Sequence, residues 1–228
     1  METNKTAHNY WNRAQIWRLK GELDIALGDM NDAIRLNSNE SAWFHGRGLL
    51  WDDKKEYDKA IADFSEAIRL NPKSGEAYSN RGKAWSDKKD YDKAIADFDE
   101  ALKHKDPNAK VGALYDSDIT GGDSTAMVNS RALTFNGIAW LRATCPDAKY
   151  RNGQQAVEYA TKACELTAWK EANNIDSLAA AYAEAGDFDK AVEWQQKGMN
   201  LAPADQKADY ESRLKLYRDN KPFRQTAK

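Results

Sequence analysis

The sequence has very few cysteines and no long apolar run. Cys145 and Cys164 are too few for a disulfide framework, and their spacing does not match that of metal ligands. We expect two free, partly buried thiols. One disulfide is the alternative, because both residues fall within the same predicted helical hairpin.

No stretch approaches the roughly 18 consecutive apolar residues that a membrane-spanning helix needs. The N-terminus, METNKTAHNYW, lacks the apolar core of a signal peptide. We therefore expect no membrane segment and a cytoplasmic location, with a removed leader peptide as the open alternative.

The sequence also lacks an excess of charge of either sign. It contains 34 Lys and Arg residues and 36 Asp and Glu residues, which gives a formal net charge of −2. A chain that is nearly neutral overall has no general attraction for nucleic-acid phosphates or for anionic lipids. The composition therefore predicts that the partner is neither nucleic acid nor a membrane.

Motifs that support catalysis or bind a cofactor are missing as well. The sequence has no glycine-rich phosphate loop, no HExxH and no GxSxG. None of the three histidines, His8, His45 and His104, is followed three or four residues later by a metal-ligating residue. We therefore predict that the chain is not an enzyme and that it binds no metal and no cofactor.

The sequence does contain a pattern that repeats every 34 residues. It is plainest in residues 41–74 and 75–108, and residues 7–40 fit the same register. The aligned residues include Trp17, Trp51 and Trp85, then Ala26, Ala60 and Ala94. A period of about 20–50 residues is typical of repeat proteins, in which each unit buries its apolar face against its neighbours.

Each unit is predicted to contain two helices. In residues 41–74 the first helix is expected from Glu40 to Asp52, and the second begins at Asp58, a predicted N-cap. The second helix ends before Pro72, because the residue before a proline avoids the helical conformation. Its apolar stripe consists of Ala60, Ile61, Phe64, Ala67 and Ile68. Gly48 and Gly82 are expected where a larger side chain would separate the paired helices.

The pattern breaks and then resumes in the C-terminal half. Residues 109–131 are predicted to form an irregular connector, because they contain Gly121 and Gly122. The aspartates of this segment resemble a calcium-binding loop only loosely, because no glutamate follows them to bind the ion through both of its oxygens. We therefore favour a solvated connector. Two further units follow at 132–170, with an insertion in the turn, and at 172–205. Residues 206–221 are predicted to form a capping helix, with a mobile tail after it.

These residues resemble the tetratricopeptide repeat (TPR) family. A TPR unit has an aromatic, a small and an aromatic residue at positions 4, 8 and 11, then Ala, an aromatic, Ala and Pro at positions 20, 24, 27 and 32. Residues 41–74 supply Phe44, Gly48, Trp51, Ala60, Phe64, Ala67 and Pro72. The C-terminal half resembles a bacterial version of the family through ATCPD, ACELT and DSLAAAYAEAGDFDKAV. The resemblance implies an all-α, right-handed α-solenoid of stacked helix-turn-helix repeats.

The resemblance also implies a binding surface. In this family the first helix of each unit lines a concave face, which partners contact mainly at positions 2, 5, 6, 9, 12 and 13. Trp11 and Trp140 are the candidate anchors, because aromatic side chains carry much of the energy of an interface. The alternative is that the polar residues are only solvated and that Trp140 packs internally. The implied contact residues are His8, Trp11, Asn12, Gln15, Arg18, His45, Leu49, Asp52, Glu76, Ser79, Asn80, Lys83, Asn136, Trp140, Asn173, Asp176 and Ser177.

The resemblance therefore implies a protein-interaction scaffold that binds a peptide or a partner helix of unknown identity. The alternative is structural self-assembly into a homo-oligomer through exposed ends of the stack.

The regularly spaced tryptophans are interpreted as structural. At position 11 of their units, Trp17, Trp51 and Trp85 are expected to fill the space between the paired helices. This register predicts that Trp51→Ala destabilises the fold by about 3–5 kcal/mol.

Overall fold

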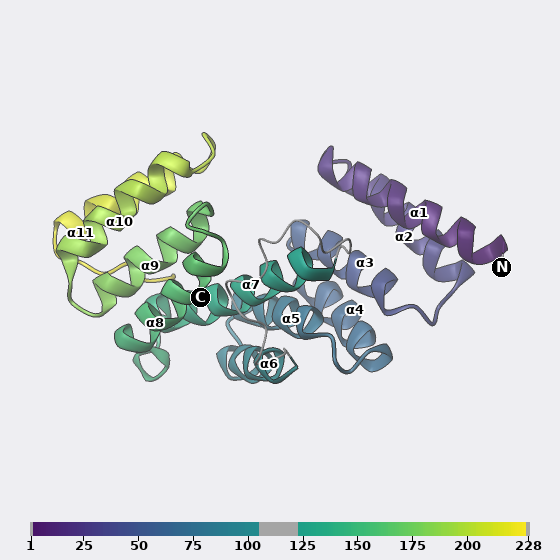
Figure 1. Ribbon diagram of the computed structural model, residues 1–228, viewed down its shortest axis with the longest axis horizontal. Coiled ribbons are helices and arrows are strands. Elements are labelled where there is room, and N and C mark those ends of the chain that lie inside the picture. Colours follow the sequence, from purple (N-terminus) through teal and green to yellow (C-terminus); the bar gives the residue numbers. More distant parts are fainter. Residues whose placement is uncertain (1, 105–122, 227–228) are drawn as a thin grey trace. The chain divides into compact units, whose positions relative to one another are not determined.

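The computed structural model describes residues 2–104 and 123–226, and within these ranges every regular element is a helix (Figure 1). The chain divides into two compact units, which we call the N-terminal unit (1–104) and the C-terminal unit (105–228). In each, consecutive helices pair and the pairs pack against one another. The predicted all-α solenoid of helix-turn-helix repeats is thus confirmed.

The N-terminal unit contains three helix pairs. Each pair is antiparallel and is joined by a short turn, and α3 also packs on α2 as α5 packs on α4. The helices are α1 (Glu2–Leu19), α2 (Leu23–Leu36), α3 (Ser41–Asp53), α4 (Tyr57–Leu70), α5 (Gly75–Asp87) and α6 (Tyr91–Lys103).

The turns within these pairs repeat the same backbone conformation. Gly21, Lys55 and Lys89 occupy one unit position, and all three have positive φ, at 79°, 61° and 66°. Helix α4 ends at Leu70, with Asn71 as its C-cap, as predicted. Its beginning differs from the prediction, because Glu56 is the N-cap and Asp58 lies in the first turn. There its negative charge favours the positive end of the helix dipole.

The core of the N-terminal unit depends on small residues facing aromatic rings. Phe64 and Phe98 are completely or almost completely buried. A Cβ atom on Gly48 would lie 2.6 Å from the Phe64 ring, and one on Gly82 would lie 3.0 Å from Phe98. Since a contact of 2.6 Å is impossible without movement, the predicted role of these glycines is confirmed.

The tryptophans of the N-terminal unit are not all equally buried. Trp17, Trp51 and Trp85 are only half-buried, and lysine ammonium groups lie over their rings, Lys59 at 4.5 Å from Trp51 for example. Trp43 is instead the buried one, with 1% of its surface exposed. It packs between α1 and α3 against His8 and Trp11. Trp51 packs against the core residues on both sides of it, as expected, but it is only half-buried. We therefore expect replacement of Trp43, rather than of Trp51, to have the larger effect on stability.

The C-terminal unit consists of five α-helices and a short 3-10 helix in its described part. Helix α9 lies at its centre and contacts α7, α8 and α10, while α11 packs on α10. The elements are α7 (Asp123–Thr144), the 3-10 helix Ala148–Tyr150, α8 (Gly153–Leu166), α9 (Ala172–Glu184), α10 (Phe188–Leu201) and α11 (Lys207–Arg218).

Helix α7 extends into the predicted connector. Residues 123–131 are helical, because the stretch from Asp123 to Asn136 contains no glycine or proline to interrupt it. The rest of the connector, residues 109–122 with Asp116 and Asp118, lies outside the described residues.

Both cysteines are buried thiols, so the disulfide alternative is not realised. Burial, and to a smaller extent the neighbouring Glu165, raises the pKa of Cys164 to about 12. The thiol is therefore protonated at neutral pH and is a poor nucleophile.

The tail after α11 is fixed, which corrects the prediction of a mobile end. The ring of Phe223 lies 5.7 Å from that of Trp140. Arg224 pairs with Glu184, and the amide of Gln225 donates a hydrogen bond of 2.9 Å to the carbonyl of Thr144. The resulting cover over α7 and α9 was not evident in the sequence, since the tail is mostly polar.

Candidate protein-binding surfaces

In the N-terminal unit, polar contacts connect the first helices of successive pairs. Arg18 of α1 pairs with Asp53 of α3 at 2.6 Å. Lys83 of α5 pairs with Asp52 of α3 at 2.8 Å, which links the second pair of helices to the third. These contacts place the predicted residues Arg18, Asp52 and Lys83 along one series of neighbouring helices.

The predicted contact residues of this unit differ in their exposure. His8, Asn12 and Glu76 are exposed, whereas Trp11, Gln15 and Leu49 are half-buried. Ser79 is fully buried, and its hydroxyl donates a hydrogen bond of 2.7 Å to the carbonyl of Gly75. Ser79 therefore has no surface that a partner could contact in this arrangement.

Lys83 is held in its charged form. Burial acts to lower the pKa of Lys83, but the carboxylates of Asp87 and Asp52 outweigh burial and raise it above its ordinary value. One oxygen of Asp52, Oδ1, is buried without a hydrogen-bond partner.

His45 is held in its neutral form. Burial lowers the pKa of His45 below its ordinary value of 6.5; Glu76 opposes this effect and Arg18 adds to it. The amide nitrogen of Asn80 lies 2.8 Å from Nε2 of His45. A neutral imidazole accepts this hydrogen bond, whereas an imidazolium has only donors to offer.

The free energy of unfolding is expected to fall as the pH drops below about 6.5. In that range the unfolded chain binds a proton at His45 that the folded chain resists, so the unfolded state binds more protons. The check is urea unfolding at several values between about pH 7 and about pH 5.5, compared with His45→Gln, which is expected to show a weaker dependence on pH. An equal dependence in both proteins would show that His45 is not responsible.

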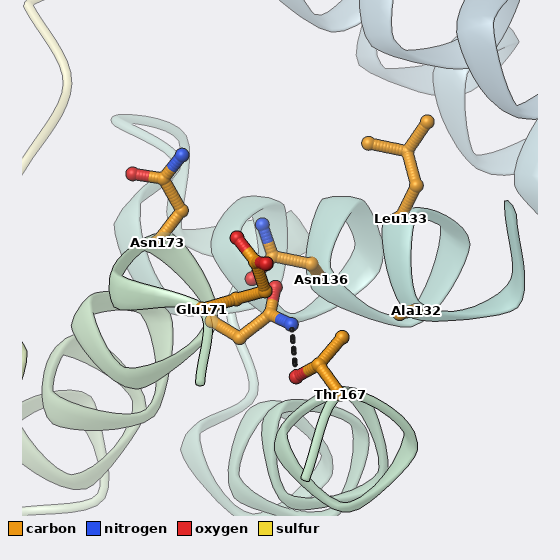
Figure 2. A pocket seen from close by; sticks show the side chains of 7 residues that line it. Ala132, Leu133, Asn136, Thr167, Glu171 and Asn173 are labelled. Atoms are coloured by element: carbon orange, nitrogen blue, oxygen red, sulfur yellow. Dashed lines mark hydrogen bonds between the residues drawn. The ribbon is translucent and has the colours of Figure 1, made fainter. Parts of the chain in front are cut away.

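The C-terminal unit contains a pocket of about 320 Å³ between the middle of α7, the turn after α8 and the start of α9 (Figure 2). Two predicted residues, Asn136 and Asn173, meet in its lining. Ala132 and Leu133 supply an apolar wall. The complete lining is Ala132, Leu133, Asn136, Thr167, Glu171, Asn173 and Asn174.

Asn136 and Glu171 bring hydrogen-bond acceptors to the lining of this pocket. The Oδ1 atom of Asn136 is buried without a hydrogen-bond partner. Glu171 is exposed at the N-cap of α9, where its side chain makes no capping bond. Neighbouring groups fix the other two amides: Asn174 donates to Thr167 at 3.1 Å, and Oδ1 of Asn173 accepts from the Tyr210 hydroxyl at 3.1 Å.

Three predicted residues of this unit face other side chains instead. Trp140 contacts Phe223, and the guanidinium of Arg213 lies 5.8 Å from its ring. Asp176 is buried and accepts hydrogen bonds from Gln195 at 2.7 Å and from Arg213 at 2.8 Å. Ser177 is also buried. The alternative of internal packing therefore describes Trp140, because Phe223 of the tail and Arg213 of α11 lie against its ring. Arg213 also covers Asp176.

One repeated ion pair was not predicted from the sequence. Arg13, Arg47 and Arg81 each bind, through two nitrogens, an aspartate 16 residues later: Asp29, Asp63 and Asp97. All six residues recur with the 34-residue period, so the signal was present in the sequence. Thr167 and Glu171 were missed because they lie outside the first helices, where no periodic position marks them.

Within 2–104 and 123–226, no group of three or more His, Cys, Asp or Glu side chains is arranged to hold a metal ion. None of the helices described here is both long and apolar enough to cross a bilayer.

Stacked helix pairs with a periodic core define this chain as an α-solenoid repeat protein. Two tetratricopeptide repeat models match it, at residues 45–110 and 176–205. Together with the helix pairs, these matches show that the chain contains tetratricopeptide repeats. No curated protein matches the sequence.

Solved structures with the same fold include several TPR proteins. PilF of Pseudomonas aeruginosa has a TM-score of 0.67 at 14% identity, over 96% of this chain and 93% of PilF. Yeast Tom70 has a TM-score of 0.60 at 20% identity, over 96% of this chain but only 41% of Tom70. YrrB, a TPR protein with an unusual peptide-binding site, has a TM-score of 0.53 at 18% identity, over 92% of this chain and 94% of YrrB. At these identities the likeness establishes the fold alone.

Proposed function

We propose that this protein is an interaction scaffold, and that it binds an extended peptide or a partner helix along its first helices. The observation that carries the proposal is the pocket of the C-terminal unit, where Asn136 and Asn173 line one cavity of about 320 Å³. Exposed residues of the N-terminal unit, among them His8, Asn12 and Glu76, extend the same proposal to that unit. YrrB supports it, because a protein of the same fold has a peptide-binding site.

The pocket favours an occupant that donates hydrogen bonds. A buried acceptor without a protein partner is costly, so a ligand N–H that reaches Oδ1 of Asn136 supplies the bond that this oxygen lacks. The carboxylate of Glu171 adds negative charge to the same lining. We therefore propose that a basic side chain of the partner, arginine or lysine, enters this pocket, with its aliphatic stem against Ala132 and Leu133.

Peptide binding tests the proposal directly. The probes are short synthetic peptides of alanine, glycine and serine that differ only in one central residue: arginine, lysine, leucine or glutamate. We expect the arginine and lysine peptides to bind about tenfold more tightly than the glutamate peptide, as measured by calorimetry. Glu171→Gln should reduce this preference, and Asn136→Ala should weaken binding of the basic peptides about tenfold.

The matched control is Asn200→Ala, which removes an exposed amide on α10, outside the pocket. It should bind all four peptides as the unaltered chain does. Equal affinity for the basic and acidic peptides, or no binding of either, would remove the support for this site.

A further inference from the structure

The helix pairs of the N-terminal unit dock on one another through a repeated set of contacts. Nη1 of Arg47 on α3 donates a hydrogen bond of 2.8 Å to Oδ1 of Asn31 on α2. Between the next two pairs, Nη1 of Arg81 on α5 donates a hydrogen bond of 3.0 Å to the hydroxyl of Ser65 on α4. The two arginines are 34 residues apart, and so are their two acceptors. One polar contact is thus used twice to join successive pairs.

A second polar contact repeats in the same way. Lys54, in the turn after α3, pairs with Asp24 of α2 at 2.6 Å. Lys88, in the turn after α5, pairs with Asp58 of α4. We call α3 and α5 the docking helices, and α2 and α4 the receiving helices. Each docking helix contributes an arginine and, seven residues later, a lysine in the turn that follows it. Each receiving helix contributes an aspartate and, seven residues later, a second hydrogen-bond acceptor.

Apolar residues fill the space beside these contacts. Trp43 and Leu50 of α3 are buried, and so are the aligned Ala77 and Ala84 of α5. The docking face of a first helix is thus an apolar strip accompanied by two cations.

Helix α1 carries the two cations of this docking face and one of its two apolar positions. At the other position, Asn9 aligns with Trp43 and Ala77. Arg13 and Lys20 occupy the positions of the arginine and the lysine, and Ile16 aligns with the buried Leu50. Ile16 is 53% exposed and the nearby Leu19 is 89% exposed. Arg13 donates hydrogen bonds to Asp29 through Nε and Nη2. Its third nitrogen, Nη1, corresponds to the atom through which Arg47 donates to Asn31. Apolar side chains exposed together on one helix face indicate that this face is covered by another surface.

Helix α6 carries the matching receiving face. Asp92 aligns with Asp24 and Asp58, and Asp99 aligns with Asn31 and Ser65. Both aspartates are exposed, and within the described residues neither has an ion pair. The first helix of the C-terminal unit has no such cations: in the register that aligns Ala139 with Gly82, α7 has Ile138 and Cys145 in their places.

We propose that the outer face of α1 docks on α6 of a second copy of this chain. In the contact, Arg13 faces Asp99, Lys20 faces Asp92, and the second copy covers Ile16 and Leu19. The two faces differ, so the association is head-to-tail, and it extends beyond a dimer unless the rotation closes a ring. It uses no residue of the proposed peptide pocket, so the two proposals can fail separately.

Light scattering and sedimentation velocity of the full chain, from micromolar to millimolar concentration, test this contact. We expect the mean mass to rise with concentration. Lys20→Glu and Asp92→Lys should each weaken association about tenfold, because each replaces an attraction with a repulsion. The double variant Lys20→Glu/Asp92→Lys restores opposite charges and should recover most of the association. Recovery by exchange of charges is not expected from a variant that merely disturbs the fold.

The apolar part of the contact has its own control. Ile16→Asp should abolish association, whereas Ile25→Asp should not. Ile25 is an exposed isoleucine of α2 that aligns with the exposed Lys59 and Lys93, and therefore lies off the docking face. The proposal is overturned if the chain stays monomeric over the whole range, or if it associates equally in the Ile16→Asp and Lys20→Glu variants.

Discussion

Replacement of Trp43 by alanine is expected to destabilise the N-terminal unit by about 3–5 kcal/mol. The ring is 1% exposed, and it packs with the apolar residues that join α1 and α2 to α3. Its indole N–H is buried without a hydrogen-bond partner. The stabilisation therefore comes from packing, and Trp43→Phe should cost much less than Trp43→Ala.

Urea unfolding followed by circular dichroism measures this effect, and hydrogen exchange read by mass spectrometry locates it. Peptides from α1 to α4 should lose protection, while peptides from the C-terminal unit should not. Trp51→Ala is the comparison: its half-buried ring loses less apolar contact, so we expect about 1–2 kcal/mol. A larger effect at Trp51 than at Trp43 would contradict this account of the core.

Replacement of Arg47 by methionine is expected to cost about 3 kcal/mol, because it leaves a buried carboxylate without its partner. Asp63 is 6% exposed, and both of its oxygens accept hydrogen bonds of 2.7 Å from Arg47. The same arginine donates to Asn31, so its loss also removes a bond between helix pairs.

The double variant Arg47→Met/Asp63→Leu separates these contributions. Removal of both charges avoids an unpaired carboxylate, so the double variant should be about 1–2 kcal/mol more stable than Arg47→Met alone. The free energies of unfolding, with Asp63→Leu as the fourth member of the cycle, decide the matter. A double variant that is less stable than Arg47→Met would show that the buried charge is not the main cost.

The fold could be predicted from the sequence because its core positions are periodic. Ala60 and Ala94, for example, are 34 residues apart, and so are Phe64 and Phe98. Each of these side chains is buried within its own repeat. Trp43 could not be found in this way. The aligned residues are Asn9 and Ala77, so the importance of Trp43 depends on its particular neighbours in α1, which no period reveals.

The candidate site was predictable only where the register of the first helices was sufficient. That register nominated Asn136 and Asn173, which line the pocket. It also nominated Ser177, which is buried, and Trp140 and Asp176, which α11 and the tail cover. The register assigns positions along a helix, but it does not show which later segment packs over them. Whether the nominated residues bind a partner stays a prediction for the peptide experiment.

The fixed tail has a consequence for the cooperativity of unfolding. In an open array each repeat contacts only its neighbours, so the terminal repeat can unfold alone. Here Arg224 donates a hydrogen bond of 3.2 Å to the carbonyl of Ala143, and Gln225 donates one to that of Thr144, at the end of α7. The last segment of the chain is thereby tied to the first helix of its own unit. Because of these hydrogen bonds, the tail cannot detach from its unit without also breaking contacts with α7. We therefore expect the tail and α7 to unfold together.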